Sequence, residues 1–208
     1  YWGNMIKRAN YEQIYHDHYC YFSIEVWRNY LKKFEMKIFD AVVTPAQDNC
    51  AIRVFICRDD RKETGRLKEI IEDEEENGIN THERSIRYRD EVHLSCNKLK
   101  EKLLELKNAG KTIAAYGASA KAGTIARAAD IGNDLIDYYV DDAPAKQGLY
   151  SPIYHVPIIS RKDAENNIPD YFLILAVNYA DNIIAKEQNF HSNGGRFIIP
   201  RGANIEIV

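Results

Sequence analysis

The sequence has no long apolar run, no excess of basic residues and no close pair of cysteines. No stretch approaches the roughly 18 consecutive apolar residues of a membrane helix, so a membrane protein is not expected. Basic residues number 28 against 31 acidic ones, so nucleic acid is not expected as the main partner. The four cysteines form no C-x-x-C pair, which argues against a structural zinc site and a disulfide framework and favours reduced thiols in a cytoplasmic protein.

The first residues also lack a secretion signal, with no basic segment followed by an apolar one. The chain starts at Tyr1 rather than at methionine, and its opening resembles the interior of a protein, which suggests part of a longer chain. The 208 residues, 45% of them apolar, suffice for one large domain or two small ones.

The first quarter of the chain predicts a helix followed by two strands. Ser23 can cap a helix over residues 23–35, which has apolar side chains on one face. Residues 36–44 and 51–57 read as strands, and the short turn between them predicts an antiparallel pair.

A charged middle segment follows. Residues 59–82 have few apolar side chains, which is typical of a solvated helix with a loop around EDEEENG; an acidic binding surface is the alternative. Residues 83–108 predict one long helix that stops near Gly110. We therefore interpret residues 59–110 as a helical linker between two units.

From Lys111 onward, apolar strands alternate with helices. The expected strands are 111–117, 135–142, 171–177 and 196–200, and the expected helices are 122–132 and 179–190. This order predicts an α/β fold with a Rossmann-like parallel sheet flanked by helices.

A glycine-containing turn, YGASAKAGT at residues 116–124, joins the first of these strands to a helix. Backbone N–H groups and the helix dipole bind phosphate at such a position. Ser119 can donate a hydrogen bond and Lys121 can supply positive charge, while Gly117 lets a ligand approach. The turn is neither a Walker loop nor a complete G-x-G-x-x-G, so a tight turn without a ligand stays open.

Acidic residues end the next strand. Asp141 follows Gly117 at about the spacing of the acid that binds ribose hydroxyls in dinucleotide folds. Lys146 could meet a phosphate or simply cover the loop. A solvated turn built on Pro144 and Gly148 is the alternative.

The segment IYHDHYCYFS, residues 14–23, places His16, Asp17 and His18 between tyrosines. If this segment were a strand, the two histidines would share a face, but no spacing elsewhere supplies a third metal ligand. Proton transfer fits better, since histidine takes a proton near neutral pH and Asp17 can orient it, with Tyr15 and Tyr19 near a polar substrate. A packed aromatic loop is the alternative.

Five segments in this order resemble one family, the S-adenosylmethionine-dependent C-methyltransferases of nucleotide-linked deoxysugars. They are YEQIYHDHYCYFS (11–23), YGASAKAGT (116–124), DDAPAKQGLYSPIYHVPI (141–158), LAVNYADNII (175–184) and GGRFIIP (194–200). The resemblance implies that residues 1–58 are the end of a methyltransferase domain and that residues 111–208 form the C-terminal Rossmann-like domain. Residues 59–110 would be the helical linker between these two domains.

The resemblance also implies roles for individual residues. His18 would be the base that deprotonates the carbon next to a keto group, with Tyr15 and Asp17 orienting the sugar and the imidazole. The implied substrate-binding residues are His16, Gly117, Ser119, Lys121, Asp141, Lys146 and Asn178. Asp17 stands where the family usually has glutamate, and SPIYH lacks the family's glycine before His155.

The family's cysteine cluster and the glycine-rich loop for S-adenosylmethionine are absent. The cofactor is therefore expected on a methyltransferase half that is missing from this chain or is a separate subunit. Two other interpretations stay open: a non-catalytic nucleotide-sugar binding module that works with such a subunit, and part of a nicotinamide-dependent oxidoreductase using Gly117 and Asp141.

Overall fold

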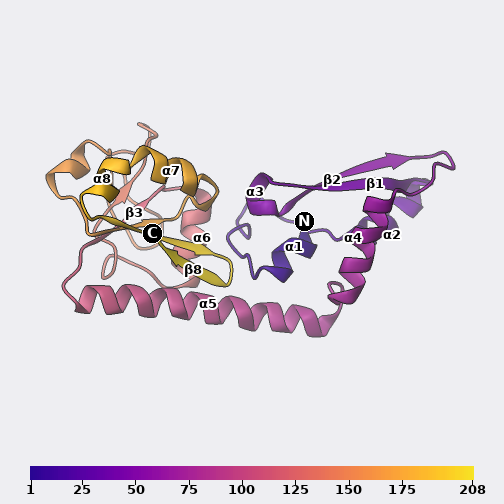
Figure 1. Cartoon of the computed structure of the whole chain (residues 1–208), viewed down its shortest axis with the longest axis horizontal. Helices are drawn as coiled ribbons and strands as arrows, with labels where there is room; N and C mark the ends of the chain where they lie inside the picture. The colour runs from indigo at the N-terminus through magenta and orange to yellow at the C-terminus, as the bar shows by residue number, and fades with distance from the viewer. The chain divides into compact units, whose positions relative to one another are not determined.

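The computed structural model describes residues 1–208, apart from the side chains of Gln47 and Asp48. The chain forms two compact units (Figure 1). Unit 1 comprises Tyr1–Asn10 and His18–Asp90, and unit 2 comprises Tyr11–Asp17 and Glu91–Val208. The division falls inside one long helix, and the short segment Tyr11–Asp17 belongs to unit 2 although its neighbours on both sides belong to unit 1.

Unit 1 is built around an antiparallel pair of strands, as the sequence predicts. Its elements are α1 (Trp2–Lys7), α2 (Ile24–Leu31), η1 (Lys32–Phe34), β1 (Lys37–Thr44), α3 (Ala46–Asn49), β2 (Ala51–Cys57), α4 (Gly65–Glu76) and the first part of α5 (His82–Asn108). Ser23 caps α2 by accepting a hydrogen bond from the Val26 N–H. Ile24 and Leu31 of α2 pack with Ile38 of β1 and Leu67 of α4 in a small apolar core.

The charged segment is more ordered than the sequence predicts. Helix α4 continues through the acidic run to Glu76, and the chain turns only at Gly78. Glu74 is buried, and its carboxylate accepts hydrogen bonds from the Ile24 and Glu25 N–H groups at 2.8 and 3.3 Å. A carboxylate at a helix N-terminus satisfies amides that have no partner within the helix. One acid of the run therefore stabilises α2 rather than facing solvent.

Unit 2 is a three-layer α/β structure with a six-stranded sheet in the order β5-β4-β3-β6-β7-β8. Its strands are β3 (Ile113–Tyr116), β4 (Tyr139–Val140), β5 (Ile158–Ile159), β6 (Tyr171–Ile174), β7 (Arg196–Arg201) and β8 (Asn204–Ile207). Its remaining elements are α6 (Ala120–Ala128), η2 (Asp163–Asn166), η3 (Val177–Tyr179), α7 (Ala180–Lys186) and α8 (Gln188–Ser192), besides the last part of α5. All pairs are parallel except β7 with β8, which confirms the predicted fold class.

Two elements of unit 2 are shorter than the sequence predicts. The strand expected over 135–142 is reduced to β4, because the chain turns at Gly132, whose carbonyl accepts the Leu135 and Ile136 N–H groups. The helix expected over 179–190 is divided into α7 and α8 at Glu187, whose side chain is buried in the fold. Strands β5 and β8 were not predicted.

The strand order identifies the edge where a ligand is expected. From β3 the chain proceeds outward to β4 and β5, and then returns to the other side of β3 for β6 and β7. The direction of winding thus changes between β3 and β6, and in open α/β sheets ligands bind outside the carboxyl ends of strands at such a point.

No helix among the described residues combines the length and the apolar character of a membrane span.

Candidate functional site

The turns after β3 and β6 lie against each other at the carboxyl edge of the sheet. Gly117 follows β3 with a φ of +94°, and a Cβ atom there would lie 2.5 Å from the Cβ of Ala176. Glycine is therefore required both by backbone conformation and by the close approach of the two turns. The predicted binding residues Gly117, Ser119 and Asn178 all lie on these two turns.

Asp141 is a buried carboxylate that organises the same edge. It accepts hydrogen bonds from the Ala118 N–H at 2.7 Å, the Ala143 N–H at 2.9 Å and the Lys146 ammonium at 3.0 Å. Burial alone would raise the pKa of Asp141, but these donors outweigh it, and the pKa lies below its usual value. Asp141 and Lys146 thus join the turns after β3 and β4.

Ser119 and Lys121 begin helix α6. The Ser119 hydroxyl accepts a hydrogen bond from the Ala122 N–H at 3.3 Å, which caps the helix. The Lys121 ammonium lies 3.6 Å from the Glu12 carboxylate, and the two side chains are only 13% and 5% exposed. Lys121 therefore contacts the residues that lead into the histidine-containing segment.

A second polar network, which the sequence did not predict, lies beside the turn after β3. Lys186 contacts Asp142 at 2.6 Å and the Tyr116 hydroxyl at 3.2 Å. The Tyr116 hydroxyl donates to Glu187 at 3.1 Å, and Arg161 Nε donates to both oxygens of that carboxylate. Burial raises the pKa of Tyr116 to about 12, with Glu187 adding to the rise and Lys186 opposing it.

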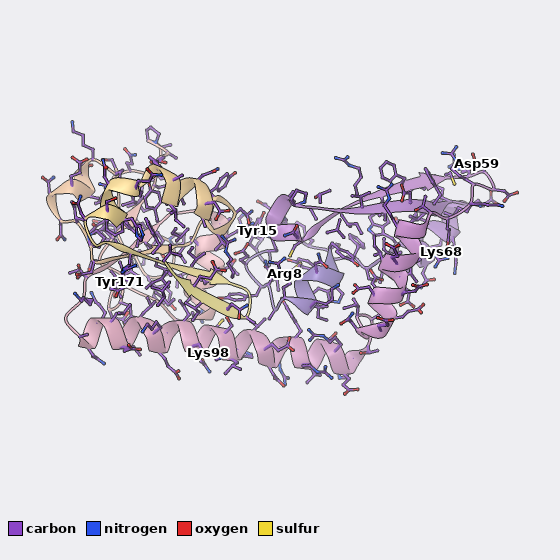
Figure 2. All side chains as sticks on the ribbon, viewed as in Figure 1. Arg8, Tyr15, Asp59, Lys68, Lys98 and Tyr171 are labelled. Atoms are coloured by element: carbon purple, nitrogen blue, oxygen red, sulfur yellow. The ribbon has the colours of Figure 1, made fainter. Side chains whose placement is uncertain are left out.

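The histidine-containing segment is a turn, not the strand that a two-histidine metal corner would need. Tyr15, which is labelled in Figure 2, is half-buried. Its ring centroid lies 6.1 Å from that of His16. His16 Nε2 lies 3.4 Å from Asp17 Oδ1, and both side chains are exposed. These three residues belong to unit 2, whereas His18 is half-buried in unit 1, where its carbonyl accepts the Tyr21 hydroxyl at 2.9 Å.

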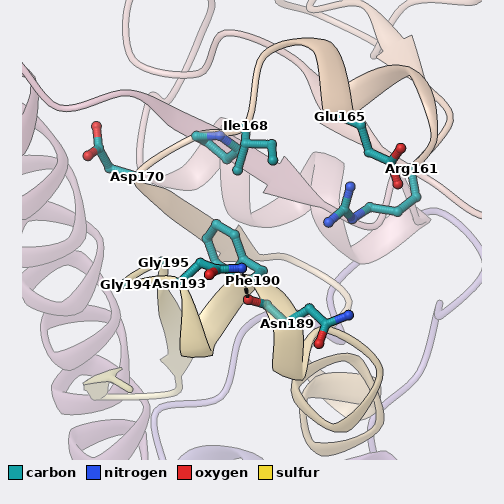
Figure 3. Close-up of a pocket in the computed structure, with 10 residues that line it drawn as sticks. Arg161, Glu165, Ile168, Asp170, Asn189, Phe190, Asn193, Gly194 and Gly195 are labelled. Carbon is teal, nitrogen blue, oxygen red and sulfur yellow. Dashed lines mark hydrogen bonds between the residues drawn. The ribbon is translucent and has the colours of Figure 1, made fainter.

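Hollows are present in both units, but none of residues 14–18 lines them. In unit 1, a hollow of about 310 Å³ is lined by residues that include Trp2, Tyr21 and Ser23. In unit 2, one of about 480 Å³ lies between α8 and the segment that precedes β6 (Figure 3). Arg161 and Phe190 line it, but the predicted substrate-binding residues do not.

Neither a metal site nor a site for the adenosine of S-adenosylmethionine is evident among the described residues. They contain no group of three or more His, Cys, Asp or Glu side chains that could hold a metal ion. The adenosine of S-adenosylmethionine would need an acid for its ribose hydroxyls. Asp141 fits that need poorly, because its carboxylate already accepts hydrogen bonds from Ala118, Ala143 and Lys146.

Fold and site define the chain as an α/β protein with a Rossmann-like C-terminal unit. Residues 50–201 match the model of the C-methyltransferase C-terminal domain, so the chain belongs to the C-methyltransferase family. It is 32% identical over 198 residues to the C-methyltransferase NovU of Streptomyces niveus. The alignment covers 94% of this chain but 47% of NovU, so the chain spans about half the length of the curated relative that it matches.

Proposed function

We propose that this chain is the C-terminal portion of an S-adenosylmethionine-dependent C-methyltransferase that acts on a nucleotide-linked keto-deoxysugar. The main support is the similarity to a C-methyltransferase over 94% of the chain. A second support is the Tyr15-His16-Asp17-His18 sequence, which combines a proton acceptor with groups that can orient a sugar.

In this proposal His18 takes the proton from the carbon next to the keto group, and Tyr15 and Asp17 orient the sugar and the imidazole. S-adenosylmethionine, held by the part of the protein outside this chain, would supply a methyl sulfonium for the electron pair left on the substrate; a C–C bond would form as the S–CH3 bond breaks and the sulfur leaves as a thioether. A positioned base accelerates such a step by roughly 10²–10⁴. His16, Gly117, Ser119, Lys146 and Asn178 are proposed to contact the nucleotide sugar. The predicted contacts of Lys121 and Asp141 with it would compete with the partners that these two side chains have within the fold.

We also propose that residues 1–58 end a methyltransferase domain whose main part lies outside this chain. The β1–β2 sheet has apolar side chains on both faces. Ile38 and Ala41 pack with the helices of unit 1. Phe39 and Phe55 lie on the other face with their ring centroids 6.2 Å apart, and Phe55 is 36% exposed. A sheet that is apolar on both faces is typical of a three-layer domain.

The role of His18 is tested in the full-length protein. His18→Ala should lower kcat by roughly 10²–10⁴ and leave the dissociation constant of the nucleotide sugar nearly unchanged, because the base acts on the reacting carbon. His93→Ala, at an exposed position of α5, serves as the matched control and should keep full turnover. Turnover retained in His18→Ala would exclude His18 as the base.

The location of the cofactor is tested with the chain as it stands. Isothermal calorimetry of the 208-residue chain should detect no binding of S-adenosylmethionine, because the acid at its Rossmann-like turn is already engaged. A thymidine-diphosphate deoxysugar serves as the second titrant. Tight binding of S-adenosylmethionine would contradict the domain assignment.

A second candidate is a nucleotide-sugar binding module that works with a separate methyltransferase subunit. It is favoured by the sheet of unit 2, which has its own core and its own phosphate-type turn. Mixing this chain with a separately expressed methyltransferase half, which carries the family's cysteine cluster, distinguishes the two candidate functions. Turnover restored by mixing supports separate subunits. Turnover that requires a fused protein supports a single chain.

A further inference from the structure

We propose that helix α6 is a positioning element for the proposed catalytic turn: Lys121 and Thr124 hold segment Tyr11–Asp17 on unit 2. The inference rests on the proposed role of His18, since it concerns the segment that leads into this residue. It assigns to Lys121 a role other than phosphate binding, and it adds Glu12 and Thr124 to the residues on which turnover depends.

The first contact is made by Tyr11. This side chain is only 6% exposed and belongs to the apolar core of unit 2, together with Leu99 of α5 and Ile125 of α6. Its hydroxyl is also a hydrogen-bond partner of the Cys96 thiol. The segment is thus anchored in the C-terminal unit at its first residue.

The second contact is the ion pair between Glu12 and Lys121. The carboxylate and the ammonium lie 3.6 Å apart and are both largely shielded from water. Gln13 Nε2 also donates to Glu12 Oε1 at 3.3 Å. Removing one member of a buried pair leaves the other charge without compensation, so this contact strongly favours one arrangement of the segment.

The third contact lies at the start of the turn. The Thr124 hydroxyl donates to the Ile14 carbonyl at 3.1 Å. Lys121 and Thr124 are three residues apart on α6 and therefore share one face of the helix. The Ser119 cap fixes where this helix begins. Lys121 and Thr124 on its shared face therefore hold Glu12 and Ile14 at fixed positions.

Because Tyr15, His16 and Asp17 follow Ile14 directly, the contacts on α6 restrict the backbone that leads to His18. A misplacement of about 1 Å in a catalytic group can cost on the order of 10²-fold in rate. The glycine turn and the histidine segment, which are far apart in the sequence, would thus act together through α6.

Hydrogen exchange of the 208-residue chain tests the anchoring independently of catalysis. Glu12→Gln and Thr124→Val should raise the exchange rates of the amides in residues 13–17, by about ten-fold or more for Glu12→Gln, while β3 stays protected. Lys100→Met, which removes the exposed ion pair of Lys100 with Asp130, is the control and should leave residues 13–17 unchanged. Unchanged exchange in both anchoring variants would overturn the proposal.

Kinetics of the full-length protein separate positioning from phosphate binding. Glu12→Gln and Lys121→Met should both lower kcat, by up to about 10²-fold, with little change in KM, and the double reversal E12K/K121E should restore part of the loss. A raised KM in Lys121→Met alone, without rescue, would instead identify Lys121 as a phosphate ligand. If His18→Ala keeps turnover, the base assignment fails, whereas the exchange experiment still decides the anchoring.

Discussion

At the scale of single residues, Gly117 and Gly123 occupy one motif but have different surroundings. Gly117 has a positive φ, and a Cβ would meet Ala176, whereas nothing lies within 4 Å of a Cβ at Gly123. Gly117→Ala should therefore lower the free energy of unfolding by at least about 1–3 kcal/mol. Gly123→Ala, inside α6, should raise it by about 0.5–1 kcal/mol. Urea unfolding of both variants checks this, and equal effects would contradict the packing of the two turns.

The sequence indicated which residues matter in this motif better than it indicated what they contact. Gly117 was predicted from its position after an apolar strand, which is a local signal. Ser119 was predicted to donate to a ligand, which stays a prediction, and the sequence did not reveal that its hydroxyl oxygen also caps α6. The partner of Lys121 could not be predicted, because Glu12 comes close only through the tertiary structure.

At the scale of elements, the buried tyrosine of strand β4, Tyr139, makes the free energy of unfolding depend on pH. Burial raises the pKa of Tyr139 to about 12, against about 10 in an unfolded chain. The protonated tyrosine is favoured in the fold, so its contribution is complete below pH 10 and is lost as the pH rises from 10 to 12. The loss is on the order of 3 kcal/mol for this residue.

Urea unfolding between pH 8 and pH 11.5 measures this loss. Tyr139→Phe should flatten the alkaline decline, while Tyr179→Phe, at an exposed position, should follow the wild-type curve. Burial also raises the pKa values of Tyr116 and Tyr138 to about 12, and it raises those of Tyr1 and Tyr154, so these residues contribute to the remaining decline. A Tyr139→Phe curve identical to the wild type would show that this hydroxyl is not shielded.

Elements with a strong local pattern were predicted, and elements defined by tertiary contacts were not. The apolar runs of β3, β6 and β7 and the cap of α2 identified those elements correctly. Strand β5 has only two residues, too few for a periodic signal. The break between α7 and α8 depends on Glu187, whose partners Tyr116 and Arg161 are distant in the sequence.

At the scale of the whole molecule, the Phe39 and Phe55 face of the β1–β2 sheet predicts a dependence on the proposed rest of the methyltransferase domain. Phe55→Thr should change the stability of the 208-residue chain by no more than about 0.5 kcal/mol, since the ring is already partly exposed. In the full-length protein the same change should cost about 1–3 kcal/mol, because the proposed additional layer would cover the ring.

Thermal unfolding of both lengths of protein checks the difference. Arg53→Lys, at an exposed position of the same strand, is the control and should be neutral in both. Equal effects of Phe55→Thr in the two proteins would argue against a further layer on this face.

The family could be recognised from ordered motifs, whereas the compact units of the structure follow from tertiary contacts. The sequence predicted boundaries near residues 58 and 110, where the composition changes. The domain boundaries themselves stay a prediction. In the structure the division between compact units falls inside α5, and Tyr11–Asp17 belongs to unit 2. That assignment depends on Tyr11, Glu12 and Ile14 finding partners on a distant helix, which composition does not record.

Because Tyr11–Asp17 belongs to unit 2, this segment limits where two related proteins can be joined in a chimera. A chimera joined anywhere between residues 18 and 90 would pair the C-terminal unit of one relative with the histidine segment of another. The donor's Tyr11 would then have to fill a cavity shaped for a different side chain, and its Glu12 would face a foreign helix. Exchange of C-terminal units between relatives should therefore succeed more often when residues 11–17 are transplanted together with residues 91–208.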